Sequence, residues 1–261
     1  NDVINVINNH KTTIINGGIG NDTVNLKSNS ALTTINGNDG NETFNVMGTG
    51  ATTTINGNNG NDVFNVRAIG SATELNGGNN NDTFNVGSKA NGTLTTTGSN
   101  SGGNVEDIKA LLTVNGDSIT GDVLNVDDTG STTAKTDGVL TPTALTGLGM
   151  SGSITYGTVE ALNVSLGTIG NIFDISDTNS STVTTINSGG GNDRVTLTTD
   201  SGITTINGQS GIDEIDVMDT DATTTINAGE GNDTITLTDS HAMTTINGNN
   251  GNDTNDNNNN N

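Results

Sequence analysis

Residues 52–66 read TTTINGNNGNDVFNV, and close variants of this string return along much of the chain every 20 residues. Thr53 and Ile55 alternate with polar neighbours before a Gly/Asn/Asp turn, and Phe64 and Val66 do the same after it. Alternation with a period of two predicts two strands that each bury one face. A fixed repeat length predicts that the copies stack as coils of a solenoid, in which each coil covers the apolar face of the next.

The predicted fold is all-β: a right-handed parallel β-solenoid (β-roll or β-helix) with about 20 residues per coil. Equal positions of neighbouring coils then lie above one another at about 4.8 Å. Phe44, Phe64 and Phe84 are expected to stack in the core. The asparagine before each turn either joins a hydrogen-bonded ladder along the stack or caps its own turn, and both interpretations are open. These asparagines are Asn16, Asn36, Asn56, Asn76, Asn115, Asn187, Asn207, Asn227 and Asn247.

Composition narrows the classes of partner. Only 28% of the residues are hydrophobic and the net charge is −22, which would indicate disorder if the chain lacked its period. Seven basic residues against 29 acidic ones argue against nucleic acid and favour cations. The absence of cysteine excludes disulfides and zinc–cysteine sites. No apolar run approaches the roughly 18 residues that a membrane span in this segment would need.

The repeat divides the chain into four segments. Regular solenoid coils are predicted for 1–86 and 183–254, irregular coils with insertions for 87–182, and a polar tail or linker for 255–261. The sequence begins inside a repeat without a signal peptide, so it is expected to be part of a longer protein. Asn255 stands where an apolar residue belongs, so the last coil is not expected to bury its second strand.

The irregular segment carries expectations of its own. The 40 residues from Asp82 to Asp122 equal two coil lengths. Residues 105–112 have a short helical period, which indicates one or two turns of helix. Residues 127–160 contain no Gly/Asn/Asp turn, and Asn171 occupies the acidic place of its coil without the charge.

Each turn between the two strands ends in an acidic residue, and we call this turn the acidic corner. Calcium takes six to eight oxygens from carboxylates and backbone carbonyls. Glycine, and after it asparagine, adopts the left-handed conformations that turn carbonyls inwards. Stacked carboxylates about 5 Å apart repel, so a dication would stabilise the stack. The alternative is a set of turns that satisfy only their own backbone. The candidate calcium-site residues are Asp2, Gly17, Gly18, Gly20, Asp22, Gly37, Gly40, Glu42, Gly57, Gly60, Asp62, Gly77, Asp82, Asp122, Gly191, Asp193, Gly211, Asp213, Gly231, Asp233, Gly251 and Asp253.

Residues 17–25 read GGIGNDTVN, which matches the Gly-Gly-x-Gly-x-Asp-x-apolar-x nonapeptide and resembles the calcium-binding RTX repeats. The other corners depart from that motif: Asn38 and Asn58 replace the second glycine, and Ser188 and Ala228 replace the first. The family places two such turns in each coil, whereas here there is one. The resemblance therefore implies calcium along a single edge.

Residues 112–116, 126–130 and 146–150 (LTVNG, VDDTG and TGLGM) resemble segments of very large bacterial surface proteins made of β-strand repeats. This resemblance implies a secreted, cell-surface or extracellular location and a structural role in an adhesin or fibre, without catalysis. The partners it implies are calcium ions, further copies joined end to end or side by side into fibres, and surface glycans.

Two other functions are weighed against this one. A polysaccharide-processing β-helix enzyme would need a site in the irregular segment, near Asp117, Asp127, Asp128 and Glu160. An ice-binding protein would need an exposed threonine face, but the threonine column that includes Thr33 and Thr53 shares the inward parity of the isoleucines.

Overall fold

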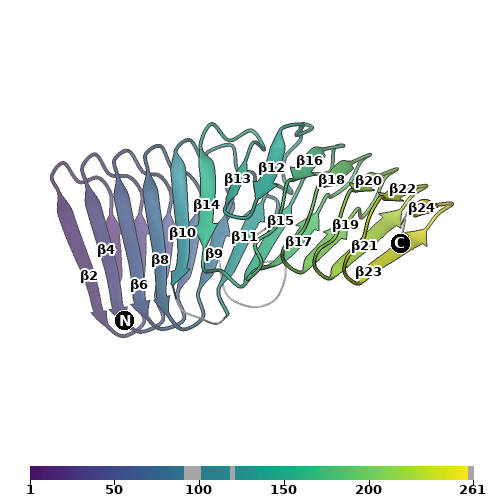
Figure 1. The fold of residues 1–261 in the computed structure, drawn as a ribbon. Helices are drawn as coiled ribbons and strands as arrows, with labels where there is room; N and C mark the ends of the chain where they lie inside the picture. The colour runs from purple at the N-terminus through teal and green to yellow at the C-terminus, as the bar shows by residue number, and fades with distance from the viewer. Residues whose placement is uncertain (91–100, 118–120, 258–261) are drawn as a thin grey trace. The chain divides into compact units, whose positions relative to one another are not determined.

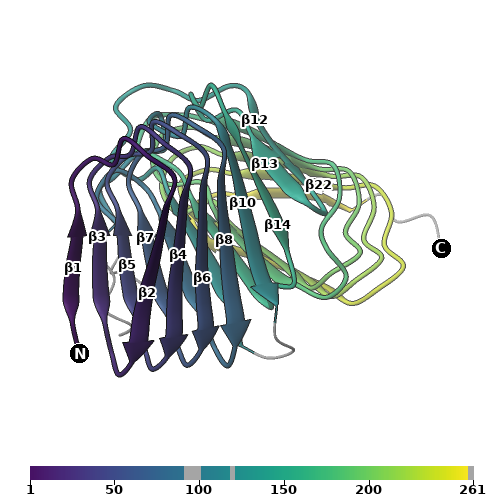
Figure 2. The ribbon, with the colours of Figure 1, turned by 90° about the vertical axis from the view of Figure 1, so that its left-hand side faces the viewer.

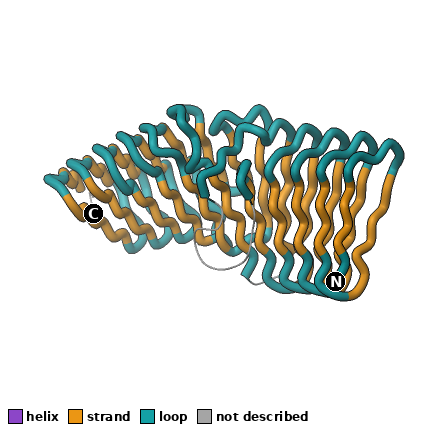
Figure 3. Tube along the Cα trace, turned by 180° about the vertical axis from the view of Figure 1, so that it is seen from behind, coloured by secondary structure: helices purple, strands orange, loops and turns teal. Residues whose placement is uncertain are grey.

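The computed structural model describes residues 1–90, 101–117 and 121–257, and these residues form strands, turns and loops without any helix (Figure 3). Two compact units divide the chain: unit 1 comprises Asn1–Asp127 with Met150–Glu160, and unit 2 comprises Asp128–Gly149 with Ala161–Asn261. Each unit stacks parallel strands about 20 residues apart, and the two contain about 12 turns in all. The predicted all-β parallel solenoid is confirmed.

Unit 1 has two parallel sheets (Figure 1). Seen from the N-terminal end in Figure 2, the chain runs clockwise as it recedes, so this unit winds right-handed as predicted. One sheet contains, in spatial order, β1 (Val3–Val6), β3 (Thr23–Leu26), β5 (Thr43–Val46), β7 (Val63–Val66), β9 (Thr83–Val86) and β11 (Val123–Asp127). The other contains β2 (Thr13–Ile19), β4 (Thr33–Asp39), β6 (Thr53–Asn59), β8 (Thr73–Asn79), β10 (Leu111–Asp117) and β14 (Ser153–Gly157).

Unit 2 repeats the two-sheet plan and adds one hairpin, because β12 and β13 pair antiparallel on either side of Pro142. The hairpin was not predicted. One sheet contains β15 (Ala161–Ser165), β17 (Val183–Asn187), β19 (Thr204–Asn207), β21 (Thr224–Glu230) and β23 (Thr244–Asn250). The other contains β13 (Ala144–Thr146), β12 (Gly138–Thr141), β16 (Ile172–Ile175), β18 (Arg194–Leu197), β20 (Glu214–Val217), β22 (Thr234–Leu237) and β24 (Thr254–Asn257).

The core lies between the two sheets and is thin. Ile55, Phe64 and Val66 are fully buried, as their parity predicts. Phe64 stacks on Phe44 with ring centroids 4.8 Å apart and on Phe84 at 4.7 Å. Of the repeating threonines, Thr33 and Thr53 are also fully buried and Thr244 at the end of the column is half-buried, so their hydroxyls do not form an outer face.

Asparagine ladders connect the coils, and they decide between the two interpretations of the asparagine before the turn. Asn56 Nδ2 donates to Asn36 Oδ1 at 2.8 Å, and the same bond recurs along both units. A second ladder, not predicted, runs along the other sheet of unit 1, where Asn45 Nδ2 donates to Asn25 Oδ1 at 2.9 Å. It continues from Asn5 to Asn125.

One expectation for the irregular segment is wrong. Residues 105–112 form no helix: residues 105–110 make turns with a single bridge from Ile108 to Ile69, and β10 begins at Leu111 and pairs in register with β8. The 40 residues from Asp82 to Asp122 add one coil to the stack together with an insertion, since β8 pairs with β10 and β9 with β11. Part of this insertion, 91–100, lies outside the described residues.

At the C-terminal end, β24 pairs with β22 although Asn255 is exposed. Backbone pairing therefore continues for one strand beyond the apolar core. The absence of a buried side chain at 255 is as expected, and residues 258–261 of the predicted tail lie outside the described part of the chain.

Truncating the central ring should test the core. Phe64→Ala removes both ring contacts and leaves a cavity, so we expect unit 1 to lose roughly 3–5 kcal/mol of unfolding free energy in urea, followed by circular dichroism. Ile14, whose side chain is 67% exposed, provides the control: Ile14→Ala should cost less than about 0.5 kcal/mol. Equal losses in the two variants would contradict this account of the core.

Candidate metal site

The acidic corners use glycine for two different reasons. At the second and fourth positions the backbone is left-handed, as at Asn38 (φ 82°) and Gly40 (φ 150°), which matches the expectation from the sequence. The first glycine has an ordinary φ, and it is required because there is no room for a side chain at this position. A Cβ on Gly37 would lie 2.5 Å from Glu42 Oε2 and 2.6 Å from the carbonyl oxygen of Gly57. The absent side chain therefore leaves a cradle lined by a carboxylate and a carbonyl.

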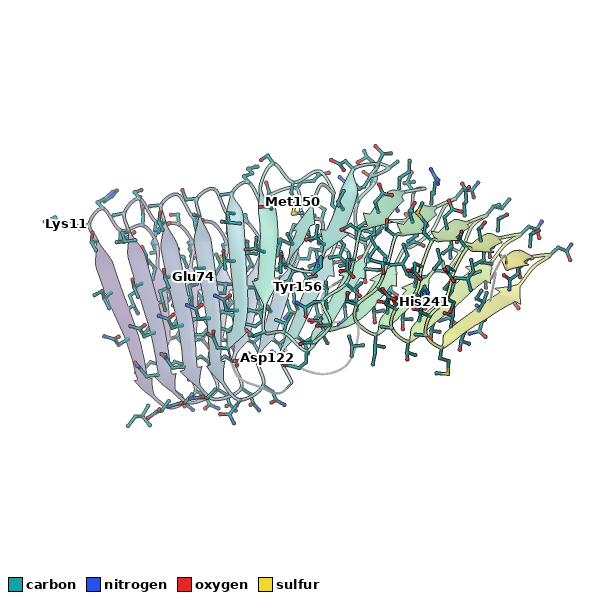
Figure 4. All side chains as sticks on the ribbon, viewed as in Figure 1. Lys11, Glu74, Asp122, Met150, Tyr156 and His241 are labelled. Carbon is teal, nitrogen blue, oxygen red and sulfur yellow. The ribbon has the colours of Figure 1, made fainter. Side chains whose placement is uncertain are left out.

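The corner acids form one column along each unit, held by backbone amides. In unit 1 the Glu42 amide donates to Asp62 Oδ1 at 2.7 Å, and the Asp62 amide donates to Asp82 Oδ1 at 2.8 Å. In unit 2 the Asp193 amide donates to Asp213 Oδ1 at 2.9 Å. Figure 4 labels Asp122, which continues the unit 1 column by accepting the Asp82 amide at 2.7 Å. One oxygen of each aspartate in the column thus reaches back to the preceding coil.

The predicted residues are brought together as expected within each unit. In unit 1 the bonds join Asp2 to Asp22, and separately Glu42 to Asp62, Asp82 and Asp122; in unit 2 they join Asp193, Asp213, Asp233 and Asp253. The predicted glycines 17, 18, 20, 37, 40, 57, 60, 77, 191, 211, 231 and 251 lie in the same corners.

One member of the column was missed. Glu160 Oε2 accepts the Asp122 amide at 2.7 Å, so Glu160 takes the acidic place of the last coil of unit 1. Residues 127–160 contain no Gly/Asn/Asp turn, yet Glu160 at their end belongs to this column. No glycine signature precedes it, but Glu160-Ala-Leu-Asn-Val164 has the same pattern as Asp62-Val-Phe-Asn-Val66 and could have identified it.

The second oxygen of most corner acids is buried without a hydrogen-bond donor. Each of these residues is at most 3% exposed. Burying a carboxylate oxygen without a partner is costly, so the column needs a proton or a cation. The atoms concerned are Oδ2 of Asp22, Asp62, Asp82, Asp193, Asp213 and Asp233, and both oxygens of Glu42.

Burial raises the pKa values of carboxyl groups in the column. Desolvation, helped by the negative charge of neighbouring corner acids, raises the pKa of Glu42 and of Asp82 to about 8. The same cause raises the pKa of Asp193 to about 7 and that of Asp213 to about 6. Metal-free corners therefore hold protons at a pH where ordinary carboxyls have lost them.

The donor set fits a hard cation. Every unpartnered atom in the column is an oxygen, and carbonyl oxygens of the next coil line the same cradles. Calcium is bound by such oxygens, whereas zinc and copper prefer nitrogen or sulfur. Bound at a corner, calcium would be held by the free oxygen of the acid and by glycine carbonyls.

Unit 2 fills two of the cradles. Ser188 replaces the first glycine, and its hydroxyl donates to the Gly208 carbonyl at 2.8 Å. Ala228, in the same position two coils later, is fully buried. At the start of the column, the neutral Asn171 donates its amide nitrogen to Asp193 Oδ1 at 3.1 Å, as its position in the acidic place suggested. Unit 2 therefore carries less uncompensated charge and less space than unit 1.

A separate group lies on the turns opposite the corners. His241, labelled in Figure 4, places Nδ1 2.9 Å from Asp219 Oδ1 and 3.7 Å from Asp221 Oδ1. The Asp219 carboxylate raises the pKa of His241. The imidazole is 56% exposed, which fits a surface ion pair.

No protein-family model, curated protein or solved structure matches this chain. The RTX resemblance thus rests on the motif residues alone. In the described part of the chain, no helix is present that is long and apolar enough to cross a membrane.

The pH dependence of stability tests the buried column. Because the folded pKa values are raised, the folded state holds protons that the unfolded chain releases, so stability falls as pH rises from about 4 to about 8. We expect the melting temperature in chelator to be lower at pH 8 than at pH 5.

A matched pair of variants isolates the column from general charge repulsion. Asp82→Asn keeps an acceptor for the Asp62 amide and removes the charge, so it should flatten the slope of melting temperature against pH. Asp39→Asn changes an exposed acid and should leave the slope nearly as it was. A melting temperature that rises between pH 5 and pH 8 would contradict the raised pKa values.

Proposed function

We propose that this chain is a structural segment of an extracellular or cell-surface fibre or adhesin, made rigid by calcium bound along the acidic columns. The observation that supports the proposal is the row of fully buried carboxylate oxygens that have no donor. Such a row of buried carboxylate oxygens needs a proton or a cation to compensate its charge. The chain carries a net charge of −22 and therefore has few basic side chains that could neutralise this row.

Calcium is favoured over protons at the pH and calcium concentration outside cells. Extracellular calcium modules typically bind with dissociation constants of about 10⁻⁴–10⁻³ M. Each corner offers one charged oxygen and carbonyls held by the β-stack, so its geometry needs little rearrangement. A dication shared by neighbouring corners also screens the repulsion between carboxylates of adjacent coils.

Binding at the corners would be coupled to folding. The unfolded chain brings no two corner acids together, so calcium binds the folded stack far better and stabilises it by mass action. A coil with a thin core gains proportionally more from this than a globular domain does. The chain would be loose at low calcium and rigid at millimolar calcium.

The location and the adhesive role rest on the resemblance to RTX repeats and to β-strand-repeat surface proteins. The repeat architecture, the absence of cysteine and the acidic surface agree with a spacer, stalk or fibre wall. Other copies of the chain and surface glycans are the partners that such a role implies.

Calcium addition tests the proposal directly. We expect millimolar calcium chloride at pH 7.5 to raise the melting temperature by more than about 10 °C in circular dichroism, since several sites act together. Asp22→Asn combined with Asp62→Asn should reduce this rise, while Asp39→Asn should preserve it. Magnesium at the same ionic strength serves as the salt control. A melting temperature indifferent to both calcium and chelator would refute calcium binding.

A further inference from the structure

Glu42 differs from the other predicted corner acids by one methylene group and by its hydrogen bonding. Each aspartate from Asp62 to Asp122 uses Oδ1 to accept the amide of the preceding corner acid. Neither oxygen of Glu42 has a partner in regular hydrogen-bond geometry, although the side chain is fully buried. The Asp22 backbone and the Asp62 carboxyl group lie close enough to Glu42 to affect its pKa.

The two oxygens of Glu42 face carbonyls from both neighbouring coils. Oε2 lies in the cradle of Gly37, where the carbonyl oxygen of Gly57 is 2.6 Å from the position of an added Cβ. Oε1 lies 2.6 Å from the corresponding point on Gly40, which also meets the carbonyl oxygen of Gly20. Four acceptor oxygens thus surround this corner, two charged and two neutral.

The aspartate corners offer a cation fewer free carboxylate oxygens than the Glu42 corner does. Asp62, for example, offers one unpartnered oxygen, because its other oxygen already holds the Glu42 amide. A cation at an aspartate corner therefore finds one free carboxylate oxygen. A cation at Glu42 finds two, in the bidentate arrangement with which glutamate closes many calcium sites.

We propose that the corner of Glu42 is a distinct calcium site, with bidentate Glu42 and the carbonyls of Gly20 and Gly57 as ligands, and that it fills before the aspartate corners. The inference rests on the proposed calcium binding and adds an order of occupancy to it. Calcium suits the site better than magnesium, because magnesium keeps several waters and demands octahedral geometry, which a fully buried carboxylate between two coils does not provide.

Calorimetric titration of the full chain with calcium chloride tests this order. The wild-type chain should show one tight site and a weaker class. Glu42→Gln, which is isosteric and uncharged, should abolish the tight site. Glu42→Asp shortens the side chain by one methylene group, which restores the aspartate of the other corners, and should weaken the first site at least tenfold. The matched control Asp82→Asn should lose one weak site and keep the tight one.

The outcomes separate this inference from the proposed function. Calcium binding to wild type with an unchanged tight site in both Glu42 variants overturns the order of occupancy and leaves calcium binding standing. Loss of the tight site in Asp82→Asn as well would show a cooperative column without a distinct site, which also overturns it. Absence of calcium binding in the wild type refutes both. Circular dichroism at saturating calcium verifies the fold, and Glu42→Asp serves if Glu42→Gln does not fold.

Discussion

The structure depends on the stacking of each side chain on its own copy, about 4.8 Å away in the next coil. Such stacking selects residues that are complementary to themselves. An asparagine amide carries both a donor and an acceptor, so it continues a ladder indefinitely, and phenylalanine rings stack at 4.7 and 4.8 Å. A carboxylate only accepts. In the described residues, the acidic columns are therefore a repeated feature that the stack satisfies only in part, through one oxygen of each aspartate.

Much of this was predictable because the period and the parity specify which positions meet. The inward positions of Ile55 and Phe64, the stacking of the corner acids and the parallel coils all follow from the 20-residue repeat. The failures have physical causes. Residues 105–112 have a helical period, but they make turns up to 110, and the strand beside β8 begins at Leu111. Glu160 lacks the glycines that identify a corner, and the asparagines of the second ladder are indistinguishable in sequence from ordinary exposed polar residues. The pairing of an acid with a backbone amide one coil away also cannot be read from spacing alone.

The two units differ in how the negative charge of the stacked corner acids is compensated. Both units leave the second oxygen of corner acids unpartnered, and unit 1 in addition keeps the first glycine open at corner after corner. Unit 2 begins its column with the neutral Asn171 and places a hydroxyl or a methyl group in the cradle at Ser188 and Ala228. Substitution in the chain thus does part of the neutralisation in unit 2 that an external cation would do in unit 1. The same fold can therefore depend on its ionic surroundings to different degrees along its length.

All of the ladders share a single repeat length, and the insertion before β10 leaves each of them in register, since Asn115 Nδ2 still bonds Asn76 and the Asp82 amide still bonds Asp122. A gene can therefore gain or lose whole coils without disturbing any column, because the neighbours that meet across the new junction are chemically the same as before. The length of the solenoid can therefore change during evolution in steps of about 4.8 Å, the spacing between coils.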